Sequence, residues 1–393
     1  MREGWTIKPL GEVGTFQRGG GFLKNDFVED GFPCIHYGQI HTVFGVATDK
    51  HLKCIPKTLA LHKSKLATTG DVILAITSED VECSCKCTAW LGNYDIAIGS
   101  HAAIYHHNLN PKFVSYYFRG PYFNRVKQKF THGIKVIEIK PSDIATISIA
   151  YPSFEEQTLI VEELDILNNV IAEKESQLKD LDALAQSIFY EMFGNPVANE
   201  KGWEKRKLGD VCTIERGGSP RPIQDFLTDA PDGINWIKIG DAVAGSKYIS
   251  STAEKIRPEG MRKSRFVHKG DFILSNSMSF GKPYILAVDG CIHDGWLVLR
   301  DNDDTFDKNY LYYYLSSPDL YNEFKRLAVG GVVNNLNSGL VRGGYVSIPP
   351  KKLQEEFAKR ENEIESQRVL VRDSIKEVQT LLDSRMNYYF AEV

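Results

Sequence analysis

The chain carries the same sequence pattern twice, about 198 residues apart. Gly4-Trp5 recurs as Gly202-Trp203, and Arg18-Gly19-Gly20 recurs as Arg216-Gly217-Gly218. A period this long is not a solenoid repeat, whose units have roughly 20–50 residues. It predicts a duplicated domain followed by a duplicated helix, with two equivalent working surfaces related by approximate symmetry. Such a chain is suited to a target made of two parts.

Composition places the chain among soluble globular proteins. Its 393 residues are enough for two domains with separate cores, and its contents of 42% hydrophobic and 25% charged residues are ordinary. No apolar run approaches the roughly 18 residues of a transmembrane helix, and the first residues lack the apolar core of a signal peptide. Seven scattered cysteines suit a reducing compartment, so we expect a cytoplasmic protein without membrane contact.

Positive charge gathers in both large domains although the net charge is −4. Residues 112–140 hold seven Lys/Arg and one acid, and residues 255–269 hold six and one. Residues 155–182, in contrast, hold nine acids and two lysines. Binding to phosphate depends on a local basic face rather than on total charge. The distribution therefore favours a nucleic-acid partner for the two domains.

The sequence predicts four segments: a mixed α/β domain at 1–152, a long helix at 153–195, a second domain at 196–350 and a second long helix at 351–393. Within the first domain, an amphipathic helix is expected from about Lys112 to Phe130, capped by Asn110. Ser153 and Glu156 form a capping-box pattern at the start of the first long helix.

Both long helices carry apolar residues that alternate by four and three, the heptad seam of a coiled coil. The second seam, which includes Arg360, Gln367 and Ser374, is less pure, and Ile375 and Leu382 widen its apolar stripe. An intramolecular antiparallel pair would satisfy both seams; the alternative is that each helix packs on its own domain. The expected seam residues are Leu164, Leu167, Ile171, Leu178, Leu181, Ile364, Val371, Val378 and Leu381.

Four loops of each domain are candidate binding loops, because their sequences change between the copies while their flanks persist. The Arg-Gly-Gly loop suits close backbone approach, and its arginine suits phosphate or guanine edges. Ordinary turns that drifted after duplication are the alternative. The candidate residues of the first domain are Arg18, Gly19, Gly20, Lys24, His36, Tyr37, Gln39, Thr77, Ser78, Thr131, His132 and Lys135. Those of the second are Arg216, Gly218, Ser219, Arg221, Lys238, Asp241, Ser275, Asn276, Ser277, Ser279, Asn334 and Asn335.

Catalytic and metal-binding motifs do not occur in the sequence. There is no Walker A pattern, no GxGxxG after a strand, no HExxH, no GxSxG and no paired CxxC. Cys83, Cys85 and Cys87 would share one face of a strand, but zinc spacing and a fourth ligand are missing, so three small buried residues are expected. We therefore expect neither a catalytic residue nor a bound metal in this chain.

The order of these parts resembles the specificity (S) subunit of type I restriction–modification enzymes over the whole chain. The resemblance rests on the Gly-Trp, Leu-Gly-acid-Val and Arg-Gly-Gly motifs and on the Pro-x-x-Glu-Glu-Gln pattern that starts the first long helix at Pro152. The second copy departs from this pattern, since Gln354-Glu355-Glu356 stands where Glu155-Glu156-Gln157 stood.

The resemblance implies an α+β fold with two α/β target recognition domains, separated by an antiparallel coiled coil and related by a pseudo-two-fold axis. Each domain would read one half of an asymmetric, bipartite site in double-stranded DNA, and the coil would set the spacer. Two modification subunits with S-adenosylmethionine would dock on it and methylate adenine N6. Restriction subunits, which use ATP and Mg²⁺, would join them. The chain itself would need no cofactor.

Three other functions remain open at this point. A related methylase–nuclease system would use the same kind of subunit, and only the partner genes distinguish it. A self-contained DNA methyltransferase would need a glycine-rich cofactor motif and an Asn/Asp-Pro-Pro-aromatic site, which this sequence lacks. A structural coiled-coil protein with heads that bind carbohydrate or protein would not show salt-sensitive binding to duplex DNA.

Overall fold

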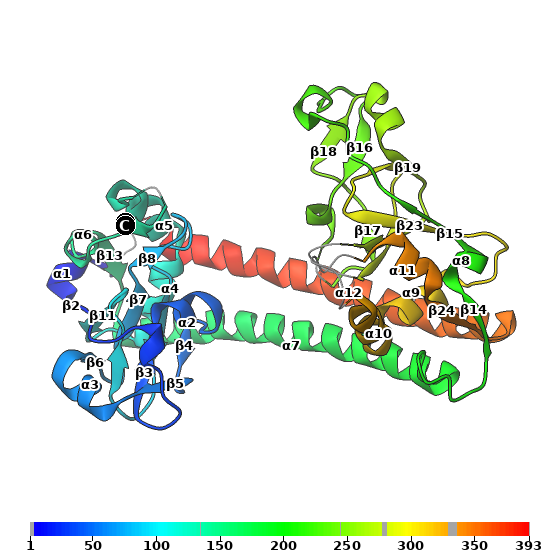
Figure 1. Ribbon diagram of the computed structural model, residues 1–393. Helices are drawn as coiled ribbons and strands as arrows, with labels where there is room; N and C mark the ends of the chain where they lie inside the picture. Colours follow the sequence, from blue (N-terminus) through cyan, green and yellow to red (C-terminus); the bar gives the residue numbers. More distant parts are fainter. Residues whose placement is uncertain (1–3, 134, 244, 277–280, 329–335, 393) are drawn as a thin grey trace. The chain divides into compact units, whose positions relative to one another are not determined.

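The computed structural model describes residues 4–133, 135–243, 245–276, 281–328 and 336–392. The chain divides into two compact units, residues 1–175 with 372–393 and residues 176–371. Each unit holds one copy of the repeat together with part of both long helices (Figure 1). Among the described residues, no helix is both long and apolar enough to cross a membrane.

The first unit is built on two sheets and two short antiparallel ribbons. The five-stranded sheet has the order β2 (Gly14–Arg18), β11 (Ala102–His107), β7 (Val72–Ala75), β9 (Cys87–Trp90) and β4 (Ala47–Thr48). The four-stranded sheet has the order β5 (Lys53–Ile55), β3 (Phe32–Ile35), β10 (Ile96–Ile98) and β6 (Lys65–Ala67). The ribbons pair β1 (Thr6–Pro9) with β13 (Ser148–Tyr151), and β8 (Thr77–Ser78) with β12 (Ile137–Glu138).

The second unit repeats both sheets and the first of these ribbons in the same strand order. Its five-stranded sheet has the order β15 (Cys212–Arg216), β23 (Trp296–Asp301), β20 (Phe272–Ser275), β21 (Pro283–Leu286) and β17 (Tyr248–Ile249). Its four-stranded sheet has the order β18 (Glu254–Ile256), β16 (Ile234–Ile237), β22 (Gly290–Ile292) and β19 (Arg265–Val267). The ribbon β14 (Glu204–Lys207) with β24 (Tyr345–Ile348) matches β1 with β13. The duplication seen in the sequence is therefore a duplication of fold.

The central strands of the five-stranded sheets are buried on both faces. In β7, Val72 and Leu74 belong to the cluster that contains helix α4 (Pro111–Arg119), whereas Ile73 and Ala75 belong to a second cluster with Trp90. A strand covered on both sides reads as a continuous apolar run, which is how it appears in the sequence. The polar loops that follow such strands are consequently held on a rigid support.

The single helix predicted over residues 112–130 is two helices. Helix α4 ends before Gly120, and α5 (Pro121–Lys127) and a 3-10 turn (Gln128–Phe130) follow it. Pro121 has no backbone N–H to continue the helical ladder, and a proline disfavours helical conformation in the residue before it. Asn110 caps α4 as predicted, since its side chain accepts from the N–H groups of Lys112 and Phe113.

The other short helices are also duplicated in part. In the first unit they are α1 (Leu10–Val13), α2 (Tyr37–Thr42), α3 (Lys57–Lys63) and α6 (Pro141–Ile144), with the 3-10 turn η1 (Lys24–Asp26). In the second unit they are α8 (Leu208–Val211), α9 (Lys308–Ser316), α10 (Pro318–Ala328) and α11 (Ser338–Gly343), with the 3-10 turns η3 (Ile223–Asp225), η4 (Ile239–Asp241) and η5 (Pro258–Lys263).

The long helices α7 (Phe154–Phe193) and α12 (Lys351–Phe390) pair antiparallel within each unit. In the first unit, Arg385 and Tyr389 of α12 donate to the carboxylate of Glu163 in α7, at 2.8 and 2.6 Å. In the second unit, the rings of Phe189 and Phe357 lie 5.6 Å apart between centroids. The helices also pack on the domains, because Leu164 lies in the core of the first unit and Phe189 in that of the second.

A buried glutamine fastens each long helix to its domain. Gln157 Nε2 donates to the carbonyl of Pro152 and its Oε1 accepts from the N–H of Asn110, both at 2.9 Å. Gln354 makes the same two bonds, to Pro349 at 2.9 Å and from Asp307 at 2.8 Å. Gln354 is thus the counterpart of Gln157, and the sequence alignment that set it against Glu155 was wrong by two positions.

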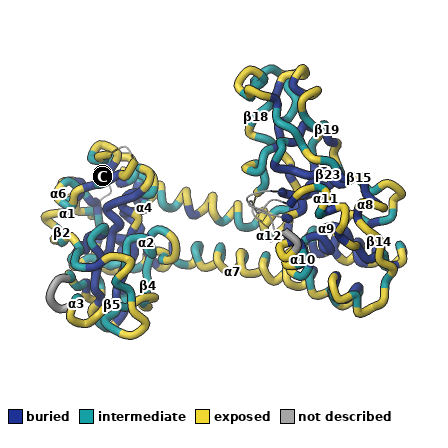
Figure 2. The backbone as a smooth tube through the Cα atoms, viewed as in Figure 1, coloured by how far each residue is buried: buried dark blue, intermediate teal, exposed yellow. Residues whose placement is uncertain are grey.

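The seam of α7 follows the predicted residues, and that of α12 departs from the prediction at Arg360, Gln367 and Leu381. Leu164 and Ile364 are buried, and Leu167, Ile171, Leu178, Leu181, Val371 and Val378 are half-buried. Leu381, however, is 49% exposed, whereas its neighbour Leu382 is 8% exposed and lies in the core of the first unit. Figure 2 shows exposed and half-buried residues alternating along the middle of α7.

Two buried charged residues explain two of these departures in α12. Glu361 and Arg368 occupy buried positions on the inner face of α12, with exposures of 1% and 3%. The predicted seam used their exposed neighbours Arg360 and Gln367 instead. Charged side chains are seldom fully buried unless paired, so a search for apolar residues passes over them.

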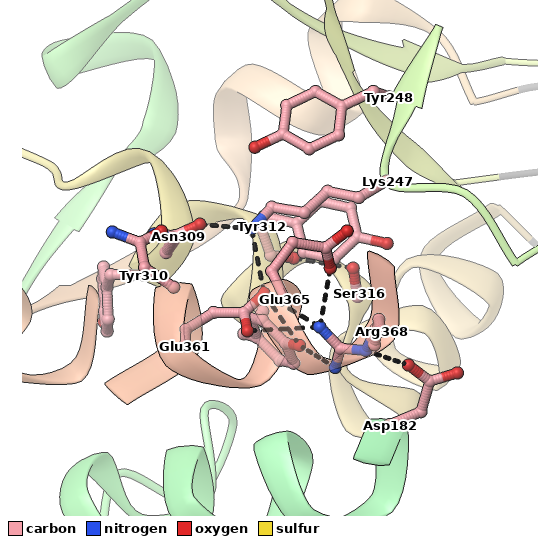
Figure 3. Close-up of polar contacts among 12 residues, drawn as sticks. Asp182, Lys247, Tyr248, Asn309, Tyr310, Tyr312, Ser316, Glu361, Glu365 and Arg368 are labelled. Carbon is pink, nitrogen blue, oxygen red and sulfur yellow. Dashed lines mark hydrogen bonds and ion pairs between the residues drawn. The ribbon is translucent and has the colours of Figure 1, made fainter. Parts of the chain in front are cut away.

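The pairing of these charges is a polar network inside the second unit (Figure 3). The carboxylate of Glu361 accepts from Lys247 Nζ at 3.0 Å, from the Tyr313 hydroxyl at 3.2 Å and from Arg368 Nη1 at 3.2 Å. Arg368 also lies 2.9 Å from Glu365 and 2.9 Å from Asp182 of α7. The network joins the loop before β17 to both long helices. Although burial opposes it, Tyr313 and the neighbouring carboxylates raise the pKa of Arg368.

We expect Glu361→Leu to lower the free energy of unfolding of the second unit by about 3 kcal/mol or more. The substitution leaves Lys247 and Arg368 buried without the carboxylate that contacts both, and breaking a buried pair is costly. Urea denaturation measures the change. Glu363→Leu removes an exposed carboxylate from the same helix and should change stability by about 0.5 kcal/mol or less. Equal stability of the two variants would contradict the importance of the network.

The corrected seam predicts opposite outcomes for two adjacent leucines. Leu382→Asp places an unpaired carboxylate in the core of the first unit and should cost at least about 2 kcal/mol of stability. Leu381→Asp changes an exposed residue and should stay within about 0.5 kcal/mol of the unmodified chain. Thermal and urea unfolding compare the two. A larger loss of stability for Leu381→Asp than for Leu382→Asp would indicate that Leu381, as the sequence predicted, lies in the seam.

Candidate functional site

The Arg-Gly-Gly loop of the first unit crosses the turn between β10 and β11. Gly19 N–H donates to Ala102 O and Gly20 N–H donates to Ile98 O, both at 2.9 Å. A Cβ atom on Gly19 would collide with the carbonyl oxygen of Gly99. The crossing therefore requires glycine, which is the close backbone approach predicted for this loop.

The second unit contains the same crossing. Gly217 N–H donates to Trp296 O at 2.9 Å, and Gly218 N–H donates to Ile292 O at 3.1 Å. A Cβ atom on Gly217 would collide with the carbonyl oxygen of His293. Both turns, residues 98–102 and 292–296, have equal length, so the two crossings share one backbone frame.

The arginine before each glycine pair points its guanidinium at the tip of the crossed turn. Arg18 Nε donates to Ser100 O at 3.4 Å, and Arg216 Nε donates to Asp294 O at 2.9 Å. Arg18 also pairs with Glu138 of β12, at 2.8 Å between Nη2 and Oε1. Both arginines are exposed and keep further N–H donors for a ligand, because a guanidinium has five.

The second predicted loop of the first unit begins α2. His36 N–H donates to Gln39 Oε1 at 2.8 Å, and His36 Nδ1 accepts from Gly38 N–H at 3.2 Å. The Tyr37 ring lies 4.5 Å from that of His36 and 5.1 Å from that of His101, measured between centroids. Burial lowers the pKa of His36, and the nearby His101 and Lys24 lower it further. His36 is therefore neutral at pH 7, and one of its ring nitrogens accepts a hydrogen bond.

The third loop of the first unit pairs with the strand that follows the fourth loop, because β8 and β12 form a ribbon there. His41 Nε2 lies 3.0 Å from Thr77 O, which joins the second loop to this ribbon. His132 exchanges backbone hydrogen bonds with Glu138, the residue that pairs with Arg18. The structure thus brings all four predicted loops of the first unit together. Lys24 and Lys135 are exposed at the edges, and Thr131 is half-buried.

In the second unit, the glycine loop and the third predicted loop converge on Asp294. Ser219 and Arg221 of the glycine loop reach the side chain of Asp294, at 2.9 and 3.4 Å. Asn276 Nδ2 donates to Asp294 O at 2.9 Å. Lys238 pairs with Glu254 at 2.6 Å, and its N–H donates to the carboxylate of Asp241. Ser277, Ser279, Asn334 and Asn335 lie outside the described residues.

Four of the predicted binding residues are buried side chains. Thr77 and Ser78 are 5% and 8% exposed, and Ser275 and Asn276 are 0% and 4% exposed. They lie where a central strand leaves the sheet, so neighbouring turns cover them. Their place is beneath the loops rather than on the outer surface, which corrects the prediction that their side chains face a ligand.

The sequence prediction missed the turn tips, Ser100-His101 and His293-Asp294, and the acid Glu138. Ser100, Asp294 and Glu138 each touch Arg18 or Arg216 from more than 70 positions away along the chain. The repeat did contain a signal for the tips, because the turn has the same length in both copies while its residues differ.

The three closely spaced cysteines were predicted on one strand, which is wrong. Cys83 and Cys85 lie in a turn, Cys85 has a positive φ of 58°, and only Cys87 lies in β9. Burial raises the pKa of Cys85 to about 12. Within the part of the chain that the structure describes, no group of three or more His, Cys, Asp or Glu residues is placed to hold a metal ion.

A family model described as "Type I restriction modification DNA specificity domain" matches residues 2–181 and again residues 200–378. The chain belongs to this family. Both matched ranges fall on the duplicated halves, so the chain is a type I restriction–modification specificity protein with two copies of the specificity domain.

Curated relatives of the type I specificity family align over much of the chain. The MjaIX specificity subunit of Methanocaldococcus jannaschii is 23% identical over 63% of this chain and 60% of its own length. The StySPI specificity subunit of Salmonella potsdam is 20% identical over 92% of this chain and 82% of its own length. The chain thus spans between three-fifths and about four-fifths of the length of these two relatives.

Solved structures of the type I specificity family share the fold. One chain, solved in a study of complex assembly and conformational transition of the type I R-M system, has a TM-score of 0.59 and 19% identity, over 100% of this chain and 99% of that one. The S subunit from M. genitalium has a TM-score of 0.54 and 12% identity, over 99% and 96%.

We expect Gly217→Ala to destabilise the second unit of this specificity protein by about 1–3 kcal/mol. The new methyl group would overpack the crossing and push the Arg216 loop away from the turn that it crosses. Urea denaturation measures the loss. Gly240→Ala in the same unit meets no atom within 4 Å and should be neutral or slightly stabilising. A neutral Gly217→Ala would refute the tight crossing.

Proposed function

We propose that each unit reads one half of an asymmetric, bipartite site in double-stranded DNA. The observation that carries this proposal is the shared crossing, which holds an exposed arginine in each unit beside turn tips of different sequence. Two recognition surfaces with the same backbone and different side chains are suited to bind two different short DNA sequences. Arginine is the usual reader of guanine in the major groove and also binds phosphate.

The long helices supply the second part of the proposal. Antiparallel pairing of α7 with α12 would set the spacer between the half-sites and offer the docking surface for two modification subunits. Residues 155–182 of α7 hold nine acids and two lysines, which makes DNA an unsuitable ligand for this helix and supports a protein partner.

We further propose that the chain has no catalytic activity and needs no cofactor of its own. The full sequence lacks the glycine-rich and Asn/Asp-Pro-Pro-aromatic motifs of amino-methyltransferases. We assign S-adenosylmethionine to the modification subunits, and ATP with Mg²⁺ to restriction subunits, in the cytoplasm. Methyl transfer by the purified chain alone would refute this assignment.

The decisive experiment is methylome sequencing of a host with and without this chain, in the presence of its modification subunits. We expect a bipartite methyladenine motif that appears and vanishes with the chain. Arg18→Ala should change or weaken one half-site only, and Arg216→Ala the other. Loss of a guanine contact costs about 1–3 kcal/mol of discrimination at one base pair, whereas loss of a phosphate contact weakens all sequences and lowers the salt slope by about one.

A matched control is Arg326→Ala, which removes an exposed arginine that pairs with Glu323 on α10. It should leave both half-sites unchanged. A methylome without a bipartite motif would contradict the proposed function. A change in both half-sites from either Arg18→Ala or Arg216→Ala would contradict independent reading by the two units.

A further inference from the structure

The tip of the crossed turn carries different residues in the two units although the backbone frame is shared. Ser100 stands in the first unit where Asp294 stands in the second, two residues after an isoleucine whose carbonyl accepts from the glycine loop. The backbone carbonyl of each tip residue accepts from the arginine, Arg18 or Arg216. The side chain of the tip is therefore presented beside the arginine in both units, and only its chemistry changes.

The carboxylate of Asp294 is oriented by its neighbours without being covered. Ser219 Oγ donates to Oδ1 at 2.9 Å, and Arg221 Nη2 donates to Oδ2 at 3.4 Å. His293 Nε2 lies 3.5 Å from Oδ1. The side chain still exposes 36% of its surface. Two carboxylate oxygens offer about four lone-pair sites, so acceptor capacity is left on the exposed side.

Electrostatics keeps this carboxylate charged and usable near DNA. The pKa of Asp294 lies below its ordinary value, despite partial burial, because of the Ser219 hydrogen bond and the nearby His293, Arg216 and Arg221. A carboxylate beside DNA is repelled by phosphate unless neighbouring cations offset its charge. Arg216 and Arg221 supply two such cations at the tip.

The first unit has different polar groups at the tip of its crossed turn. Its tip carries the Ser100 hydroxyl, and the acid that pairs with Arg18 comes from β12 as Glu138. A hydroxyl both donates and accepts, whereas an ionised carboxylate only accepts. The two units therefore offer different hydrogen-bonding patterns from the same place in the frame.

We infer that Asp294 is a specificity-determining residue of the second unit, whose carboxylate accepts a hydrogen bond from the exocyclic amino group of one base. In the major groove these donors are cytosine N4 and adenine N6, and acidic side chains are the usual partners of cytosine N4. Ser219 and Arg221 are positioning residues that orient the carboxylate. The inference rests on the proposed function and names the chemistry of one contact within it.

The test compares Asp294→Asn and Asp294→Ser with the unmodified chain, each assembled with its modification subunits. We expect the preference at one base pair of one half-site to fall by about tenfold or more, with the other half-site and the spacer unchanged. Methylome sequencing identifies the position, and competition between duplexes that differ only there measures the fold-change. Asp289→Asn, at the opposite end of β22, removes the same charge from the same unit and should leave the motif intact.

The reciprocal change is Ser100→Asp, which should alter the half-site read by the first unit and leave the second unchanged. The inference fails if both Asp294 variants retain the wild-type second half-site while binding weakens equally for all sequences. That result would leave the carboxylate a purely structural role. It differs from failure of the proposed function, in which the unmodified chain yields no bipartite motif.

Discussion

A buried glutamine at the start of each long helix determines how helix and recognition domain are joined. Gln157 and Gln354 each connect the end of the last domain strand with the capping residue of the domain's aromatic helix, α4 or α9. An amide suits this place because it can donate and accept at once, and the two groups that it meets are a backbone carbonyl and a backbone N–H. The aromatic packing of Phe193 on Tyr310 and of Phe390 on Phe113 then completes each joint.

Most of the architecture was predictable from the repeat. Aligning the two long helices with each other would also have located the buried positions of α12 correctly. The buried positions Phe357, Glu361, Ile364 and Arg368 match Ile160, Leu164, Leu167 and Ile171 of α7, one for one after the two glutamines are aligned. Hydrophobicity alone could not place this seam, since two of its four members in α12 are charged. Aligning the two copies therefore identifies buried positions that the apolar pattern of one helix alone does not reveal.

The positions of the binding loops were predictable from the sequence, whereas the roles of their individual side chains were less so. Glycine and proline punctuation located the loops, and each sheet brings their ends together. Burial of Thr77 and Ser275 and the contacts of Asp294 depend on strands that approach from distant parts of the sequence. No local pattern encodes such contacts, because they arise from the order of strands within the sheets. The untested residues, Lys24 and Lys135 among them, are exposed and stay predictions as DNA contacts.

The buried Lys247 network has a consequence for exchanging recognition domains between related chains. A foreign second domain without a cation at the position of Lys247 would leave Arg368 as the remaining cationic partner of Glu361 within the network. A foreign domain whose loop before β17 has another length or course would not bring its cation to Glu361. The first domain meets α7 through Lys112 and Tyr116 on Asp165, a pair of contacts nearer to solvent. Chimeras should therefore tolerate replacement of the first domain more readily, and a transplanted second domain should bring its own partner segment of α12.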